Sequence, residues 1–127
     1  MRYLLDTHTL IWFFENSSEL PHKTKEIILL DSNEKYICSV SLWEIAIKVN
    51  LGKLKISFSL EELINDIKIR NFHILQIEDE FLKGLSILPF IHKDPFDRLL
   101  IATALAEDLT IITIDENIQK YDVSWIW

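Results

Sequence analysis

The chain has 127 residues, a formal net charge of −7 and 49% hydrophobic residues. This length predicts one domain over residues 1–127, with enough apolar side chains for a full core. The negative charge argues against a general electrostatic attraction to nucleic acid, and the single cysteine, Cys38, excludes a disulfide or a cysteine metal site within one chain. No apolar segment approaches the roughly 20 residues of a membrane span and no targeting signal is visible, so we expect a cytoplasmic protein without a membrane partner.

Strands and helices are predicted to alternate along the chain. Short apolar or β-branched runs predict strands at residues 2–5, 35–39, 72–77, 110–113 and 123–127. Capping residues and helical periodicity predict helices at 7–15, 21–30, 41–51, 60–70, 79–88, 95–106 and 116–121. In the second of these helices we expect Ile27, Ile28 and Leu30 to face the core. This order predicts an α/β domain whose mostly parallel sheet is covered by helices on both faces.

One predicted helix carries two acids at its entrance. Asp94 is a suitable N-cap, and Pro95 fits the first helical position, where its missing N–H costs nothing. The run from Leu99 to Ala106 is apolar on nearly every face, which predicts a buried helix. The second acid, Asp97 in the first turn, is explained either by helix capping or by an acidic metal pocket.

Each of four acids has a plain structural interpretation when taken alone. Asp6 and Asp115 follow predicted strands and precede helices, as helix caps do. Glu44 lies four residues before Lys48 in the orientation of a helix-surface ion pair, on the stripe opposite the apolar face of its helix. Asp97 is favoured in a first turn by the helix dipole. No single acid therefore predicts a functional site.

The four acids together are more informative. In a parallel sheet, ligands bind beyond the carboxyl ends of the strands, where Asp6 and Asp115 are placed. Glu44 and Asp97 lie on helices that can border the same crevice. Carboxylates brought together stay ionised only when cations neutralise them, and oxygen ligands suit Mg²⁺ or Mn²⁺. Such ions serve phosphoryl chemistry by activating water and stabilising the leaving oxygen.

Four segments carry a family resemblance. The sequence resembles the PIN-domain ribonucleases of VapC type, the toxins of toxin–antitoxin pairs, at residues 1–7 (MRYLLDT), 39–48 (SVSLWEIAIK), 92–102 (HKDPFDRLLIA) and 109–115 (LTIITID). The resemblance implies a three-layer α/β/α sandwich. It also implies a metal-dependent endoribonuclease that hydrolyses phosphodiester bonds in single-stranded or loop RNA with metal-activated water.

The resemblance also implies site residues and partners. Asp6, Glu44, Asp97 and Asp115 would be the catalytic acids and the ligands of Mg²⁺ or Mn²⁺, with Asp94 left as the helix cap. We expect Thr7 and Thr113 to orient the carboxylates, and Lys48 and Arg98 are candidate phosphate contacts or ion-pair partners. His92 is either a proton shuttle or incidental. The implied partners are an RNA substrate, a cognate antitoxin protein and a second copy in a homodimer.

Other functions are compatible with parts of the pattern. A small-molecule phosphohydrolase of the haloacid dehalogenase kind needs a second Asp two residues after the first, but His8 stands at that position. A response-regulator receiver needs paired early acids, which are not visible. A non-catalytic binding module, in which all four acids are caps or surface charges, stays open. Specific stabilisation by Mn²⁺ would distinguish an acidic pocket from such a module.

Overall fold

The computed structural model describes all 127 residues and contains one five-stranded sheet. Its strands are β1 (Arg2–Leu5), β2 (Glu34–Cys38), β3 (His73–Leu75), β4 (Thr110–Ile112) and β5 (Trp125–Ile126). The strand order is β3-β2-β1-β4-β5, and every neighbouring pair is parallel. The predicted mostly parallel sheet is therefore confirmed, and β5 lies at an edge as expected.

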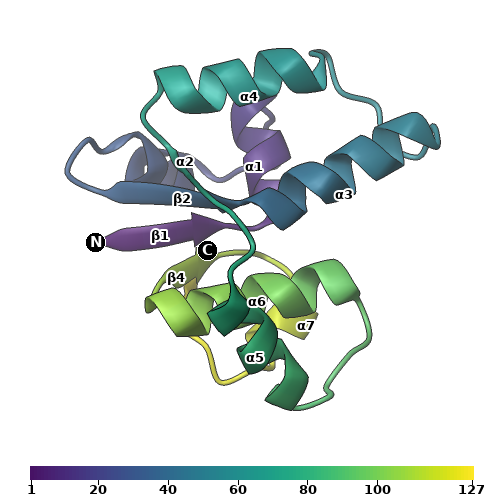
Figure 1. Cartoon of the computed structure of the whole chain (residues 1–127). Coiled ribbons are helices and arrows are strands. Elements are labelled where there is room, and N and C mark those ends of the chain that lie inside the picture. The colour runs from purple at the N-terminus through teal and green to yellow at the C-terminus, as the bar shows by residue number, and fades with distance from the viewer.

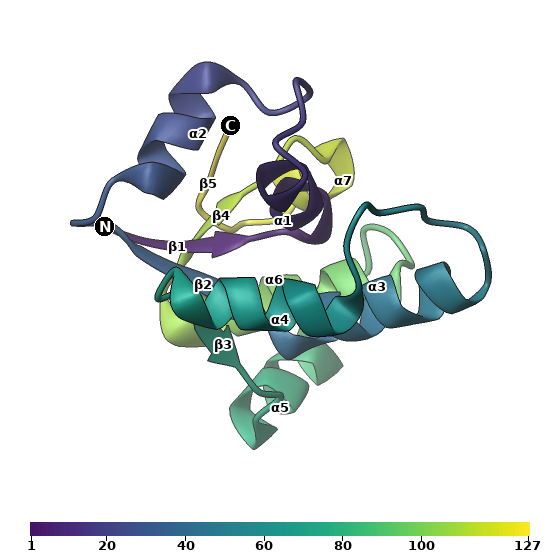
Figure 2. The same ribbon diagram turned by 90° about the horizontal axis from the view of Figure 1, so that it is seen from above.

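Seven helices surround this sheet. They are α1 (Thr7–Phe14), α2 (His22–Leu29), α3 (Ser39–Asn50), α4 (Leu60–Ile69), α5 (Asp79–Ile87), α6 (Pro95–Glu107) and α7 (Glu116–Gln119). Helices α1, α2 and α4 cover one face, and α5, α6 and α7 cover the other (Figure 1; Figure 2). The predicted three-layer α/β/α sandwich is confirmed. None of these helices combines the length and apolar character of a membrane span.

The central strand β1 is buried on both faces. Tyr3 and Leu5 join the core cluster under α1, α2 and α4, whereas Leu4 joins the cluster under α5, α6 and α7. Leu4 and Leu5 have no exposed surface. Because successive side chains of a strand point to opposite faces, a continuous apolar run is what a strand between two helical layers requires.

Helix starts follow the local signals in the sequence. Ser59 and Glu62 form the predicted capping box at the start of α4. At the start of α6 the Asp94 side chain accepts hydrogen bonds from the backbone N–H groups of Phe96 and Asp97, at 2.9 and 3.1 Å, and Pro95 occupies the first helical position. These caps fix where two helices of opposite layers begin.

Several element limits differ from the prediction. Helix α3 begins at Ser39, two residues earlier than expected, and follows β2 directly. The sequence did not mark this start, because the N-cap residue Cys38 makes no side-chain hydrogen bond to the helix. Leu30 was expected to face the core but is 55% exposed, since it lies beyond the last residue of α2 in an extended conformation. Strand β5 has only two residues, and the terminal Trp127 packs edge-on against Trp12.

Candidate active site

The candidate site lies where the order of the strands reverses. From β1 the chain builds β2 and β3 on one side, then returns to place β4 on the other side of β1. Asp6 directly follows β1, and Thr113 and Asp115 follow β4. In open α/β sheets, this reversal leaves a crevice beyond the carboxyl ends of the two central strands. Asp6 and Asp115, two of the four predicted acids, therefore follow adjacent strands at the same end of the sheet.

Asp6 is a buried carboxylate with several donors. The residue is 3% exposed; its Oδ1 accepts from the Thr9 N–H at 2.8 Å, and its Oδ2 accepts from the Thr113 hydroxyl. Burial raises the pKa of Asp6, and the hydrogen bonds from Thr113 and Thr9 oppose that rise. Asp6 thus caps α1 and also presents a carboxylate beside β4.

Glu44 is buried rather than solvent-exposed, contrary to what the opposite-stripe pattern suggested. It is 4% exposed, its Oε1 accepts from the Thr7 hydroxyl at 2.8 Å, and its Oε2 lies 2.6 Å from the Lys48 ammonium. The Thr7 hydroxyl also lies 3.0 Å from the Ser41 hydroxyl. Because Thr7 directly follows Asp6, this contact ties Glu44 on α3 to the end of β1.

Asp97 lies in the first turn of α6, with its side chain 20% exposed. The pKa of Asp97 is raised from 3.8 to about 6: burial raises it most, the hydrogen bond with His92 opposes the rise, and the charges of Asp94, Asp115 and Glu44 add to it. Carboxylates influence one another in this way only when they lie close together. Glu44 on α3 and Asp115 after β4 therefore lie near enough to Asp97 for their charges to act on its carboxyl group.

Asp115 has a second role as a helix cap. Its Oδ1 accepts from the backbone N–H groups of Asn117 and Ile118, at 2.8 and 3.4 Å. The Thr113 hydroxyl accepts from the Asp115 N–H at 2.9 Å while donating to Asp6. Thr113 therefore joins the two strand-end acids, as Thr7 joins Asp6 to Glu44. That these threonines orient metal ligands stays a prediction.

The donor set suits a small divalent cation. Near these carboxylates Lys48 carries one positive charge, and its pKa is raised first by the hydrogen bond with Glu44 and further by Asp94 and Asp97. No three His, Cys, Asp or Glu side chains lie close enough together to hold one ion by themselves. Mg²⁺ usually keeps several waters and binds one or two carboxylates together with substrate phosphates. The unbalanced negative charge and the separated carboxylates fit that mode of binding.

Arg98, a candidate phosphate contact, is engaged in hydrogen bonds within the protein, and the phosphate contact stays a prediction. The residue is 8% exposed, and its guanidinium donates to the backbone carbonyls of Leu88, Pro89 and His92, at 3.3, 2.9 and 3.4 Å. It also donates to the Tyr121 hydroxyl at 3.0 Å. We therefore interpret Arg98 as a structural residue that ties the loop before α6 to that helix. Lys48 remains a candidate phosphate contact, although it is paired with Glu44.

Two residues of the site were missed or left undecided by sequence reasoning. His92 Nε2 lies 3.2 Å from Asp97 Oδ2, and His92 Nδ1 lies 2.9 Å from the Tyr121 hydroxyl. The five-residue spacing of His92 and Asp97 gave a local hint. Tyr121 is 29 residues from His92 and gave no signal, because only the fold brings the segment after α7 to this loop.

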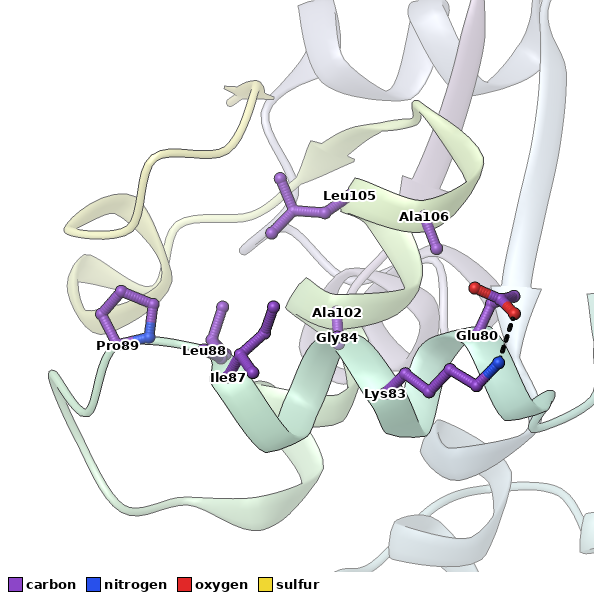
Figure 3. Close-up of a pocket in the computed structure, with 9 residues that line it drawn as sticks. All are labelled: Glu80, Lys83, Gly84, Ile87, Leu88, Pro89, Ala102, Leu105 and Ala106. Carbon is purple, nitrogen blue, oxygen red and sulfur yellow. Dashed lines mark hydrogen bonds and ion pairs between the residues drawn. The ribbon is translucent and has the colours of Figure 1, made fainter.

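A groove of about 600 Å³ lies elsewhere, between α5 and α6 (Figure 3). Its lining is largely apolar and includes Ile87, Leu88 and Leu105, with the ion pair of Glu80 and Lys83 at one end. None of the four predicted catalytic acids lines it. The groove is therefore separate from the acidic crevice.

Comparison with known proteins identifies the fold. The model of the PIN domain family matches residues 3–124. Among curated proteins, no sequence matches this chain. The structure of VapBC2 from Rickettsia felis, bound to a DNA fragment from their promoter, contains a similar chain with a TM-score of 0.72 and 18% identity, covering 99% of this chain and 98% of that one.

Two further solved structures are similar. VapBC-1 from nontypeable Haemophilus influenzae has a TM-score of 0.68 and 19% identity, with 99% of this chain and 97% of that chain covered. A toxin–antitoxin complex from Klebsiella pneumoniae has a TM-score of 0.66 and 17% identity, with 98% and 96% covered. At these identities the likeness shows the fold, and the family model spans nearly the whole chain. The protein belongs to the PIN-domain family.

Proposed function

We propose that this protein is a metal-dependent endoribonuclease and the toxin of a toxin–antitoxin pair. The observation that carries the proposal is the gathering of acids at the strand reversal, where Asp6 and Asp115 follow β1 and β4 and the charges of Glu44 and Asp115 act on Asp97. Membership of the PIN-domain family supports a hydrolase that acts on nucleic acid. The solved neighbours that are toxin–antitoxin or VapBC assemblies support the biological context.

In this proposal Asp6, Glu44, Asp97 and Asp115 hold Mg²⁺ or Mn²⁺ together with water and the substrate phosphate, which complete the coordination. A bound ion would activate water for attack on phosphorus and neutralise charge on the phosphate and the leaving oxygen. Thr7 and Thr113 keep the carboxylates of Glu44 and Asp6 in fixed orientations by donating hydrogen bonds to them. Lys48 is the cation placed to attract a substrate phosphate, since it already lies among the acids.

Single-stranded or loop RNA is the proposed substrate. Trp43 is 58% exposed, and its ring packs edge-on against Phe96 at 5.4 Å between centroids. Each of these aromatic residues directly precedes a proposed catalytic acid, Glu44 or Asp97. An exposed aromatic ring beside a phosphate-binding crevice can stack on an unpaired base, which duplex RNA does not offer.

The proposed partners follow from the same context. We propose a cognate antitoxin, because the solved neighbours include VapBC and toxin–antitoxin complexes. A net charge of −7 suits an antitoxin segment that carries basic residues toward the acidic crevice. A homodimer and a cytoplasmic location complete the proposal, and both stay predictions.

Cleavage of RNA by matched variants tests the function. The wild type, Asp97→Asn and Asp94→Asn are expressed, and cellular RNA ends are sequenced. The wild type should generate new ends that carry a 5′-phosphate, and Asp97→Asn should reduce them by about 100-fold. Asp94→Asn removes the same charge three residues away but keeps a good N-cap, so most activity should remain.

The outcomes separate the proposed function from its alternatives. Equal cleavage by the wild type and Asp97→Asn would contradict the catalytic assignment. No cleavage by any of the three proteins, together with no specific response to Mn²⁺, would favour the non-catalytic binding module. Hydrolysis of small phosphate esters without RNA cleavage would favour a small-molecule phosphohydrolase, for which no feature of this structure speaks.

A further inference from the structure

A chain of polar contacts runs from Arg98 through Tyr121 and His92 to Asp97. The Arg98 guanidinium lies 3.0 Å from the Tyr121 hydroxyl, which lies 2.9 Å from His92 Nδ1. His92 Nε2 lies 3.2 Å from Asp97 Oδ2. Tyr121 is 5% exposed, and the His92 side chain is 12% exposed. The contacts thus form a largely buried network that ends on one of the acids.

The network is anchored at Arg98. An arginine has no acceptor and stays protonated, so it enters every hydrogen bond as a donor. Besides Tyr121, its guanidinium donates to three backbone carbonyls in residues 88–92, and it lies 4.7 Å from the centroid of the Phe90 ring. These contacts hold the guanidinium and the loop that carries His92 in one arrangement.

The Tyr121 hydroxyl has only one way to complete its hydrogen bonds. It accepts from Arg98 at 3.0 Å and from the backbone N–H of His92 at 3.2 Å, which uses both of its lone pairs. Its own proton must therefore be donated. The nearest acceptor is His92 Nδ1 at 2.9 Å, since the His92 carbonyl oxygen is 3.5 Å away.

This count of donors fixes the tautomer of His92. If Nδ1 accepts a proton from Tyr121, then Nδ1 carries no hydrogen, and the neutral ring carries its hydrogen on Nε2. Nε2–H then donates to Asp97 Oδ2. A hydrogen on Nδ1 would instead be a third donor toward a hydroxyl oxygen that has two lone pairs. The four residues therefore form one directional chain of hydrogen bonds.

We propose that His92 is a positioning residue for Asp97, with Tyr121 and Arg98 fixing its tautomer. The inference rests on the proposed function, because it concerns a proposed metal ligand. His92 holds Oδ2 of Asp97, which leaves Oδ1 as the oxygen available to a divalent cation. Groups that orient a metal ligand in this way commonly change metal affinity by about 10- to 100-fold when they are removed.

Two near-isosteric variants separate the two ring nitrogens. The amide nitrogen of His92→Gln stands close to the position of Nε2 and can still donate to Asp97. The amide of His92→Asn stands close to Nδ1 and can meet Tyr121 but not Asp97. Isothermal titration with Mn²⁺ should give an affinity for His92→Gln within about 3-fold of the wild type and for His92→Asn at least about 10-fold weaker.

The titration with Mn²⁺ also distinguishes failure of the positioning role of His92 from failure of the proposed function. If the wild type binds Mn²⁺ and His92→Asn binds it as tightly while showing the wild-type circular dichroism spectrum, the positioning role is overturned and the proposed function stands. If the wild type and Asp97→Asn bind Mn²⁺ equally, or neither binds it, the proposed function fails and the positioning role fails with it.

Nuclear magnetic resonance tests the tautomer without any metal. In the wild type, ¹⁵N–¹H correlations of the imidazole should show His92 protonated on Nε2 and unprotonated on Nδ1. Tyr121→Phe keeps the buried ring but removes the hydroxyl, so it should give a mixture of tautomers and a Mn²⁺ affinity between those of the wild type and His92→Asn. A wild-type His92 protonated on Nδ1 would overturn the inference.

Discussion

Asp97 is a carboxylate whose charged form carries a free-energy cost in the folded chain. Its location at a buried helix entrance, near three other acids, disfavours the charged form. His92 offsets part of that cost by hydrogen bonding, and the buried helix α6 keeps Asp97 in its place. Residues of this kind reduce the stability of a protein in exchange for binding or catalysis.

We expect Asp97→Asn to be more stable than the wild type at neutral pH in the presence of a chelator. The Asp97 pKa is about 6 in the folded chain and about 3.8 for the unfolded chain, so the folded state binds more protons between these values. The wild type therefore loses stability as the pH rises from about 4 to about 6, and the variant does not. The difference should grow by about 2 kcal/mol between about pH 4.5 and about pH 7.5 in urea unfolding.

The control for this prediction is Asp94→Asn. It also removes one negative charge from the entrance of α6, but Asn keeps the cap of that helix. Its stability relative to the wild type should change less with pH than that of Asp97→Asn. If Asp97→Asn and the wild type lose stability in parallel over this pH range, Asp97 is not the carboxylate with the raised pKa.

Among the helices and strands, the sequence predicted the features that depend on residues close together in the chain, such as helix caps and buried apolar runs. Ser59 and Asp94 mark helix starts because a cap acts within three residues, and β1 was visible as a buried apolar run. The start of α3 at Ser39 was missed because no side chain caps it. Strand limits at the sheet edges were overestimated, since pairing with a neighbour decides them and not the composition of the segment.

In the candidate site, too, features set by the local sequence were predicted and features set by long-range contacts were not. The placement of Asp6 and Asp115 at strand ends was predicted, because the carboxyl ends of parallel strands share an edge. The role of Arg98 and the contact between His92 and Tyr121 were not predictable, since they join a loop, α6 and the segment after α7 that meet only in the folded chain. Contacts of this kind leave no spacing pattern in a single sequence.

The packing of α5 against α6 allows a prediction about Gly84. This glycine lies inside α5, and a Cβ added there would meet the Ala102 Cβ at 3.8 Å, an ordinary contact distance. Alanine restricts the unfolded chain and favours the helix relative to glycine. Gly84→Ala should therefore raise the free energy of unfolding by about 0.5–1 kcal/mol, measured by urea denaturation.

Gly52 provides the opposite case. Its φ is +71°, a left-handed conformation that follows the end of α3. Although no atom lies within 4 Å of an added Cβ, alanine is strained in this conformation, so Gly52→Ala should lower the free energy of unfolding by about 1 kcal/mol.

The two glycine variants are compared in the same urea denaturation experiment. A loss of stability in Gly84→Ala would show that the α5–α6 contact does not accept a methyl group.

Across the whole molecule, the sheet and helix α3 connect the two helical layers. Helix α3 packs against α1 and α4 on one side and against α6 on the other. Glu44 therefore comes from the helix that bridges the layers, and Asp97 comes from the lower layer in Figure 1. Asp6 and Asp115 follow the carboxyl ends of β1 and β4. A cation bound among these acids would connect parts of the chain that unfolding separates.

A global stability measurement therefore reports on the site. A ligand that binds only the folded chain stabilises it by RT ln(1 + [L]/Kd), which is about 2.7 kcal/mol at 100 times Kd. Mn²⁺ should raise the melting temperature of the wild type and of Asp94→Asn, and should raise that of Asp97→Asn much less. NaCl at matched ionic strength controls for screening, which relieves repulsion between exposed acids without a specific site. Equal shifts for the wild type and Asp97→Asn would place any bound Mn²⁺ away from Asp97 and would contradict its proposed role as a metal ligand.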